Sequence, residues 1–320
     1  MEDIPPGVEA VRLPERFIHK AGSILLAVPR IKAEIRKFQP QIINALFIPN
    51  YGWAGALSGF APLVISAWGS DVLISPRKSW LHRRRVSWAM SKADLLFSDA
   101  RVITERMIEL GADRQRIITV PLGIDPALLA RQLDKSSADD RCTIITNRKF
   151  EPLYHNDTFV EAAVQLAQAN TSMKFVLIGE GRTRAELEER VQRAGLRETI
   201  MFRPFLAAKD LYDELAAGDI YVSCSASDGT SVSLLESLAL GLYPLVTDIP
   251  ANREWIKDGV NGRLFPVGDA AALARVILEV SKDRHQWPEV IDRNRALIKE
   301  RALWPDNMAQ VERAMMRLIE

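Results

Sequence analysis

Short apolar runs alternate with amphipathic stretches along most of the 320-residue chain. Apolar runs of about four to eight residues are typical of buried strands, and apolar positions spaced three or four apart are typical of helices. In the first part of the chain, strands are predicted at 8–13, 41–46, 63–67, 95–98 and 117–120, with helices at 22–38, 53–58, 80–91 and 100–110. Such alternation predicts a parallel sheet with helices on both faces.

The alternation restarts after a polar segment at 134–141 that contains no bulky apolar residue and has the composition of a linker. Strands are then predicted at 143–146, 174–178, 199–203, 220–224 and 243–247. Helices are predicted at 157–169, 184–194, 210–217 and 270–282, from near Thr230 or Ser231, briefly from Pro250, and from 294 to the end with a break near Pro305.

The fold class that this pattern predicts is α/β, with two doubly wound Rossmann-like domains. We expect the first domain at 1–136, the second at 137–300, and a C-terminal helix at 301–320 that returns to the first domain. Ligands of open parallel sheets bind at the carboxyl ends of the strands. Two such domains facing one another would place the binding site in the cleft between them.

The composition is that of an ordinary globular protein, with 48% hydrophobic and 26% charged residues. A net charge of +1 does not favour a nucleic-acid partner. Two cysteines, Cys142 and Cys224, imply no disulfide framework, and no spacing of cysteine or histidine indicates a metal site. No apolar run reaches the roughly 20 residues of a membrane span, and the start does not resemble a signal peptide. We therefore expect a cytoplasmic protein.

The most informative stretch runs from Ser223 to Gly241, where a strand end, a loop and an apolar helix follow one another. The N–H groups and dipole at the start of such a helix can hold an anion. Glu236 lies within this helix, and a buried carboxylate needs polar partners, such as the hydroxyls of a bound sugar or ribose. The alternative is that Glu236 occupies a narrow polar side of the helix beside Ser233 and Ser237.

Three other loops follow predicted strands and carry candidate binding groups. Gly179 and Gly181 could let the backbone approach a ligand or could simply form a turn, because the full dinucleotide motif is absent. Arg148 could hold a phosphate through its bidentate fork or could be an ordinary surface cation. Asp71 could bind a substrate hydroxyl or could cap the segment that follows it.

A basic segment at 77–92 forms a fourth candidate. No acidic residue occurs from Val72 to Ala93, while Trp80 and Trp88 are interleaved with six cations: Arg77, Lys78, Arg83, Arg84, Arg85 and Lys92. Cations beside tryptophan on a helix indicate contact with an anionic membrane surface, which would place the protein peripherally on the inner face of the membrane. The alternative is a solvated helix face.

Taken together, these features resemble the retaining, nucleotide-sugar-dependent glycosyltransferases of family 4, which have the GT-B fold. The segment from Asp228 to Val246 resembles that family's Glu-x7-Glu motif and its trailing Ala-x-Gly-x-Pro-Val. The later Asp258-Gly259-Val260-Asn261-Gly262 matches the family's continuation. In the first half, Gly69-Ser70-Asp71 and Pro121-Leu122-Gly123-Ile124-Asp125 resemble its His-Gly-x-Asp and Pro-x-Gly-x-Asp signatures.

The resemblance implies roles for individual residues. Glu236 would bind the ribose hydroxyls of the donor, and Arg148 would neutralise the diphosphate leaving group. Asp228 would hold the donor sugar and its phosphates together with the amides of Gly229, Thr230 and Ser231. Asp71 would lie on the acceptor side. Further donor-binding positions are Tyr154, His155, Gly179 and Gly181.

The resemblance also implies which partners the protein has. The donor would be a nucleotide-diphosphate sugar, and the acceptor a glycan, a lipid-linked saccharide or a small molecule. No metal and no cofactor are expected.

The sequence departs from the family at several positions. Asp228 replaces a glutamate, Trp68 replaces a histidine, and Tyr154 replaces a lysine whose charge only a protonated His155 could restore. The family's opening strand, glycine-rich loop and helix do not occur in the given sequence, which either begins late or belongs to a truncated member with an incomplete first sheet. We expect the first domain to lack its opening β-α unit and the 320-residue chain to be weakly active or inactive. A non-catalytic binding or partner protein of the same fold remains the alternative. A sugar-nucleotide epimerase is disfavoured, because no acid/base pair can be identified.

Overall fold

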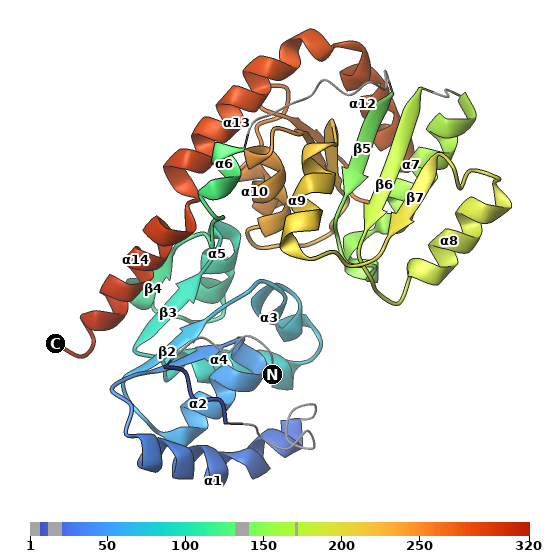
Figure 1. Ribbon diagram of the computed structural model, residues 1–320. Coiled ribbons are helices and arrows are strands. Elements are labelled where there is room, and N and C mark those ends of the chain that lie inside the picture. Colours follow the sequence, from blue (N-terminus) through green and yellow to red (C-terminus); the bar gives the residue numbers. More distant parts are fainter. Residues whose placement is uncertain (1–6, 12–20, 132–140, 170–171) are drawn as a thin grey trace. The chain divides into compact units, whose positions relative to one another are not determined.

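A computed structural model describes residues 7–11, 21–131, 141–169 and 172–320. The chain forms two compact units, Met1–Ser98 with Ile103–Thr119 and Glu312–Glu320, and Asp99–Val102 with Val120–Val311. Each unit contains one parallel β-sheet with helices packed on it (Figure 1). The predicted α/β class is therefore confirmed. The expected boundary at 136/137 lies outside the described residues.

The first unit is built on a parallel sheet in the order β1-β2-β3-β4. Its central strands are buried on both faces, as their continuous apolar runs require: Leu63, Val64 and Ile65 are at most 1% exposed. The strands are β1 Ile43–Leu46, β2 Leu63–Ser66, β3 Leu95–Ser98 and β4 Ile117–Thr119. The helices are α1 Ala21–Phe38, η2 Ile48–Gly52, α2 Trp53–Ser58, α3 Ser70–Leu73, η3 Ser75–Arg77, α4 Trp80–Ser91, α5 Arg101–Glu109 and η4 Arg114–Arg116.

The strand predicted at 8–13 is wrong in its described part. Residues 8–11 form no strand, and Val8 and Val11 are 57% and 46% exposed. Alternating apolar residues predict a strand only where a neighbouring strand is available for pairing, and these residues have none in the described sheet. Residues 12 and 13 lie outside the described part of the chain.

The second unit is built on a parallel sheet in the order β10-β9-β8-β5-β6-β7. The chain runs outward from β5 in one direction and outward from β8 in the other, so the winding reverses between β5 and β8. Such a reversal leaves the loops after the two strands side by side at one edge of the sheet. The strands are β5 Cys142–Thr146, β6 Met173–Ile178, β7 Ile200–Arg203, β8 Ile220–Ser223, β9 Tyr243–Thr247 and β10 Arg263–Phe265.

Successive side chains of these strands enter two different cores, because strand residues alternate between the faces of a sheet. Ile144 and Val222 belong to the core that includes helices α7 and α12. Ile145 and Tyr221 belong to the core that includes helix α10. The sheet is thus covered on both faces, as the alternation of strands and helices predicts.

The helices that follow β4 are α6 Ala127–Ala130, η5 Pro152–Tyr154, α7 Asn156–Ala169, α8 Arg184–Arg193, α9 Ala208–Ala216, α10 Val232–Ala239, α11 Pro250–Arg253, α12 Ala270–Lys282, η6 Arg284–Gln286, α13 Trp287–Arg301 and α14 Trp304–Met316. Helices α7 to α12 lie close to their predicted positions, whereas α6, η5 and η6 were not predicted. The C-terminal helical region begins at Trp287, earlier than predicted, and its break falls at residues 302–303. Strand β10, three residues long, is an element that the sequence pattern did not indicate.

Candidate active site

An arginine and an aspartate meet where the winding of the second sheet reverses. Arg148 follows β5 and Asp228 follows β8, and these two strands are paired neighbours. The Nη2 of Arg148 donates to Oδ2 of Asp228 at 2.6 Å, and its Nη1 donates to Oγ of Ser231 at 2.8 Å. The strand order therefore joins two predicted donor-binding residues that are 80 positions apart in sequence.

Arg148 is 8% exposed, and its charge is balanced locally. Burial acts to lower its pKa, but the Asp228 carboxylate together with Tyr221 and Tyr154 holds the pKa of Arg148 above its ordinary value. Burial likewise acts to raise the pKa of Asp228, while Arg148 and the Gly229 N–H oppose this effect. At 2.6 Å the attraction keeps the two groups charged. The Nε of Arg148 is buried and has no hydrogen-bond partner among the described residues.

The Ser231 hydroxyl accepts hydrogen bonds from both helix α10 and Arg148. Its Oγ accepts the Leu234 N–H at 3.4 Å as the N-cap of the helix and also accepts Arg148. The neighbouring Thr230 is already engaged, because its N–H donates to Oδ2 of Asp99 at 3.2 Å and its hydroxyl donates to the Asp99 carbonyl. The Thr230 amide that was expected to bind phosphate is thus paired within the protein.

Glu236 lies on the second turn of α10 and is half-buried. Burial raises its pKa, while a hydrogen bond from Tyr212 lowers it. The Tyr212 hydroxyl donates to Oε1 of Glu236 at 3.0 Å and is the one hydrogen-bond partner that the described residues give this carboxylate. Burial, with the Glu236 carboxylate next in effect, raises the pKa of Tyr212 to about 12, so the tyrosine stays a donor.

A cavity of about 390 Å³ joins these groups within the second unit. Glu236 and Ser233 line it from α10, and Arg148 and Gly179 line it from the loops after β5 and β6. Glu236 and Ser233, the polar residues on this side of α10, therefore face a cavity rather than open solvent. Ser237, which was considered as part of that polar side, is instead fully buried.

The structure brings only some of the predicted site residues to this cavity. Arg148, Tyr154, Gly179 and Glu236 line it, whereas six other predicted donor-binding positions in the described chain do not: His155, Gly181, Asp228, Gly229, Thr230 and Ser231. Asp228 and Ser231 reach it indirectly, through the side chain of Arg148.

The two glycines after β6 have a structural explanation. Gly179 and Gly181 have φ angles of 138° and 152°, which L side chains rarely adopt. A Cβ at Gly181 would clash with the Phe150 carbonyl, and one at Gly179 would lie 3.3 Å from the Arg148 carbonyl. Both glycines let this loop pack against the backbone that carries Arg148, and Gly179 also lines the cavity.

Tyr154, which stands where the family has a lysine, and the next residue, His155, make different contacts. The ring of Tyr154 lies under the guanidinium of Arg148, 4.4 Å from centroid to carbon. This cation–π contact steadies the arginine. His155 adopts left-handed backbone angles at the end of η5, and its Nδ1 lies 3.8 Å from Asp157. It is therefore directed to a carboxylate rather than to the cavity.

Asp71 is a buried carboxylate of the first unit and is 0% exposed. Its Oδ2 accepts the Ile48 N–H at 3.1 Å and its Oδ1 accepts the Trp68 N–H at 3.0 Å. Burial raises its pKa, while these N–H donors lower it. Both oxygens thus hold main-chain loops together, but the donors of these two bonds precede Asp71 and no side chain of the described residues caps α3, so they are not the expected cap of the segment that follows.

Several residues at or beside the cavity were not singled out from the sequence. Tyr212, which donates to the cavity residue Glu236, comes from α9. Phe205, which is 78% exposed, lines the cavity from the loop after β7. Lys149 brings a second cation to the same cavity, and Asn147 has a buried Oδ1 without a hydrogen-bond partner among the described residues. Only Asn147 and Lys149 had a usable signal, namely their place directly after a strand.

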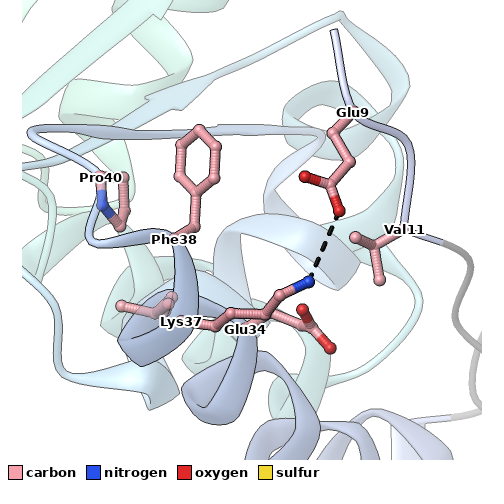
Figure 2. A pocket seen from close by; sticks show the side chains of 7 residues that line it. Glu9, Val11, Glu34, Lys37, Phe38 and Pro40 are labelled. Atoms are coloured by element: carbon pink, nitrogen blue, oxygen red, sulfur yellow. Dashed lines mark ion pairs between the residues drawn. The ribbon is translucent and has the colours of Figure 1, made fainter.

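A separate cavity of about 400 Å³ lies in the first unit at the end of α1 (Figure 2). Glu9 and Lys37 line it and form an ion pair of 3.5 Å with each other, beside Phe38, which is 72% exposed. Its charged pair is satisfied internally, and none of its residues was a predicted site residue. Within the described ranges, none of the helices combines the length and the apolar character needed to cross a bilayer.

Comparison with known proteins supports a common ancestry. The chain is 24% identical over 275 residues to the amylovoran biosynthesis glycosyltransferase AmsK of Erwinia amylovora, covering 82% of this chain and 67% of the relative. It is 25% identical over 294 residues to an α-1,4-N-acetyl-D-galactosaminyltransferase of Campylobacter jejuni that is named for an undecaprenol-linked substrate, covering 89% of this chain and 77% of the relative. Two further relatives match over 30% and 32% of their own length.

The fold is shared with solved structures. Anabaena Alr3699/HepE in complex with UDP-glucose superimposes with a TM-score of 0.77 at 19% identity, covering 94% of this chain and 84% of that protein. A model described as "Glycosyl transferase 4-like" matches residues 2–100, and a model described as "Glycosyl transferases group 1" matches residues 132–301. A match over more than half of the chain, in the unit that holds Arg148 and Glu236, shows that this protein belongs to the glycosyl transferases group 1 family, of the GT-B class.

Proposed function

We propose that this protein transfers a sugar from a nucleoside diphosphate sugar to a glycan or lipid-linked acceptor, with retention of anomeric configuration and without a metal ion. The observation that carries the proposal is that a guanidinium and a half-buried carboxylate line one cavity where the sheet winding reverses. A diphosphate needs the first group, and the hydroxyls of a ribose need the second.

Arg148 is the residue proposed to receive the negative charge that grows on the leaving diphosphate. Asp228, Ser231 and Tyr154 fix its guanidinium before any ligand binds, so little reorganisation is needed during reaction. In this role Asp228 is a positioning residue. Lys149 lines the same cavity and is proposed to supply the second positive charge that the family takes from the position of Tyr154. Arg148 and Lys149 are thus the two cations proposed to contact the diphosphate, with the Asp228 carboxylate offsetting part of their charge.

Glu236 is proposed to accept hydrogen bonds from the two ribose hydroxyls. Its carboxylate is half-buried and has one neutral partner, Tyr212, so it retains unused acceptor capacity. Phe205 and Leu206 line the same cavity and would give the flat base an apolar contact. The donor is proposed to carry uridine, because the solved neighbour HepE is described in complex with UDP-glucose.

The proposed acceptor class follows from the relatives. The Campylobacter relative is named for a glycan carried on undecaprenol diphosphate, and the Erwinia relative for amylovoran biosynthesis. A growing glycan on a lipid carrier is therefore the acceptor proposed for this chain.

Calorimetric titration with UDP tests the binding part of the proposal. Arg148→Met is expected to weaken binding roughly 100-fold, because a charge-assisted contact to the diphosphate is lost. Glu236→Ala is expected to weaken it at least about tenfold. Glu186→Ala removes an exposed carboxylate of α8 and should leave the affinity unchanged. Melting curves show whether each variant folds, and Arg148→Met/Asp228→Asn removes the aspartate charge that Arg148→Met alone would leave uncompensated.

Transfer to a lipid-linked saccharide, followed by NMR of the anomeric proton, tests the chemistry. An α-linked product from an α-configured donor supports retention. An inverted product contradicts it. UDP binding without any transfer would instead support the non-catalytic alternative, and failure of the native protein to bind any nucleoside diphosphate would overturn the assignment of the cavity.

A further inference from the structure

Helix α4 of the first unit has a buried side and an outward side. Ser79 caps its start by accepting the His82 N–H at 3.3 Å. Val86 and Ala89 are 0% exposed and Met90 is 2% exposed, so these residues attach the helix to the unit. The other positions of the helix are more exposed, and tryptophan, leucine and arginine predominate among them.

The outward side of α4 carries large apolar side chains. Trp80 is 69% exposed, Leu81 is 60% exposed and Trp88 is 36% exposed. Trp80, Arg84, Trp88 and Lys92 follow one another at four-residue spacing and so share one side of the helix. Apolar groups clustered on a surface in this way are characteristic of an interaction site.

A cavity of about 460 Å³ lies beside this side of the helix. Trp53, Leu81 and Trp88 line it together with Arg84 and Arg85. The guanidinium of Arg85 stacks 4.7 Å above the Trp53 ring, donates to Oδ1 of Asn50 at 3.0 Å and donates to the Pro49 carbonyl. Its Nε is buried without a hydrogen-bond partner in the described chain.

The positive charge around α4 is not neutralised within the described residues. None of its six cations forms an ion pair there with a carboxylate: Arg77, Lys78, Arg83, Arg84, Arg85 and Lys92. Helix α8 provides the contrast, because Arg184, Arg190 and Arg193 each pair with a glutamate at 3.4 Å or less. Five of these cations are exposed and therefore remain available to an external anion, whereas Arg85 is held by Trp53, Asn50 and Pro49.

We propose that the α4 surface, defined by Trp80, Leu81, Arg83, Arg84 and Trp88, docks on an anionic phospholipid membrane. The indole rings and Leu81 would enter the headgroup layer, where amphipathic rings are favoured. The cations would meet the lipid phosphates. A soluble polyanion would account for the charges but would gain nothing from the exposed Trp80 and Leu81, so the combination favours a membrane.

Co-sedimentation of the full chain with vesicles tests this proposal without any assay of activity. Vesicles of phosphatidylglycerol and phosphatidylcholine should bind the protein, vesicles of phosphatidylcholine alone should bind it weakly, and raised salt should release it. Arg83→Gln/Arg84→Gln should weaken binding about 25-fold, at about fivefold for each cation. Trp80→Ser/Leu81→Ser should also weaken it at unchanged charge.

The matched control is Arg193→Gln/Lys299→Gln, which removes the same charge from exposed positions on other helices and should bind like the native protein. Far-UV circular dichroism and melting curves confirm that each variant is folded. Equal binding of native and α4 variants would overturn the proposal, as would equal losses in the control. Release of the protein by inorganic phosphate at constant ionic strength, or dispensability of Trp80 and Leu81, would assign the surface to a soluble anion instead.

Discussion

Asp71 and Glu236 are both carboxylates at least partly withdrawn from solvent, yet their environments differ. Asp71 is fully enclosed, and each of its oxygens accepts a main-chain N–H. Glu236 is half-buried, accepts one tyrosine hydroxyl and faces a cavity. Burial acts to raise the pKa of both. The first carboxylate completes the protein's own hydrogen bonding, and the second retains capacity for a ligand.

This difference teaches how to separate structural from functional acids in a fold of this kind. Burial and a shifted pKa are common to both residues and do not discriminate between them. The hydrogen-bond partners of each carboxylate do discriminate between them. A carboxylate that satisfies backbone donors is part of the scaffold, whereas one that faces a cavity with unused lone pairs is a candidate binding group. Substitutions at the two positions should therefore affect different measurements.

The largest effect on stability is expected at Asp71. Asp71→Ala leaves the N–H groups of Ile48 and Trp68 buried without acceptors, and each such group costs about 1–3 kcal/mol. The free energy of unfolding should fall by about 2–5 kcal/mol in urea titrations. Asp71→Asn keeps one acceptor oxygen and should lose roughly half as much. Loss of transfer activity at unchanged stability would contradict this and support an acceptor-side role for Asp71.

A smaller effect of opposite sign is expected at Glu236. Glu236→Gln removes a half-buried charge but keeps an oxygen that can accept from Tyr212. The free energy of unfolding at neutral pH should rise by about 1 kcal/mol, while the affinity for UDP should fall roughly tenfold. Glu186→Gln, on exposed α8, should change neither quantity. A variant that loses stability and keeps affinity would show that Glu236 is scaffold, like Asp71.

The smallest effect is the pH dependence of that stability difference. Burial holds the folded pKa of Glu236 above its ordinary value of 4.5, so the folded state binds the proton more tightly than the unfolded state. Its contribution to stability is then fullest below 4.5 and is lost as pH rises through the folded pKa. Urea titrations across this range should show native and Glu236→Gln proteins diverging as pH increases.

Tyr212→Phe provides the control for that measurement. It removes the hydrogen bond that lowers the Glu236 pKa, and so should move the divergence to higher pH. Curves that stay parallel in all three proteins would show that the Glu236 pKa is the same in the folded and unfolded states.

The local elements could be predicted well from the sequence. The predicted helices at 53–58, 80–91 and 270–282 coincide with α2, α4 and α12. Their ends carry local signals: the side chains of Ser79 and Asp269 cap two of the starts, and Gly59 ends α2 in the left-handed conformation. Such signals act between residues a few positions apart, so they can be read without knowledge of the fold. The exposed residues 8–11 show the limit, because a strand also needs a partner.

The candidate site was predictable only in part. The sequence pointed to Arg148, Tyr154 and Glu236 through their place after strands or in an apolar helix and through the family resemblance, and all three line the cavity. It did not indicate Tyr212 or Phe205, because a tyrosine on an amphipathic helix and a phenylalanine in a loop have no distinctive spacing.

The sequence by itself determined the alternation of strands and helices, and hence the α/β class and the loops that carry polar residues. Only the tertiary structure decided which loops meet. Arg148 and Asp228 pair because β5 lies beside β8, and that order depends on how helices from distant parts of the chain pack on the two faces of the sheet. Periodicity reports which side of an element is buried; it carries no information on which element becomes its neighbour.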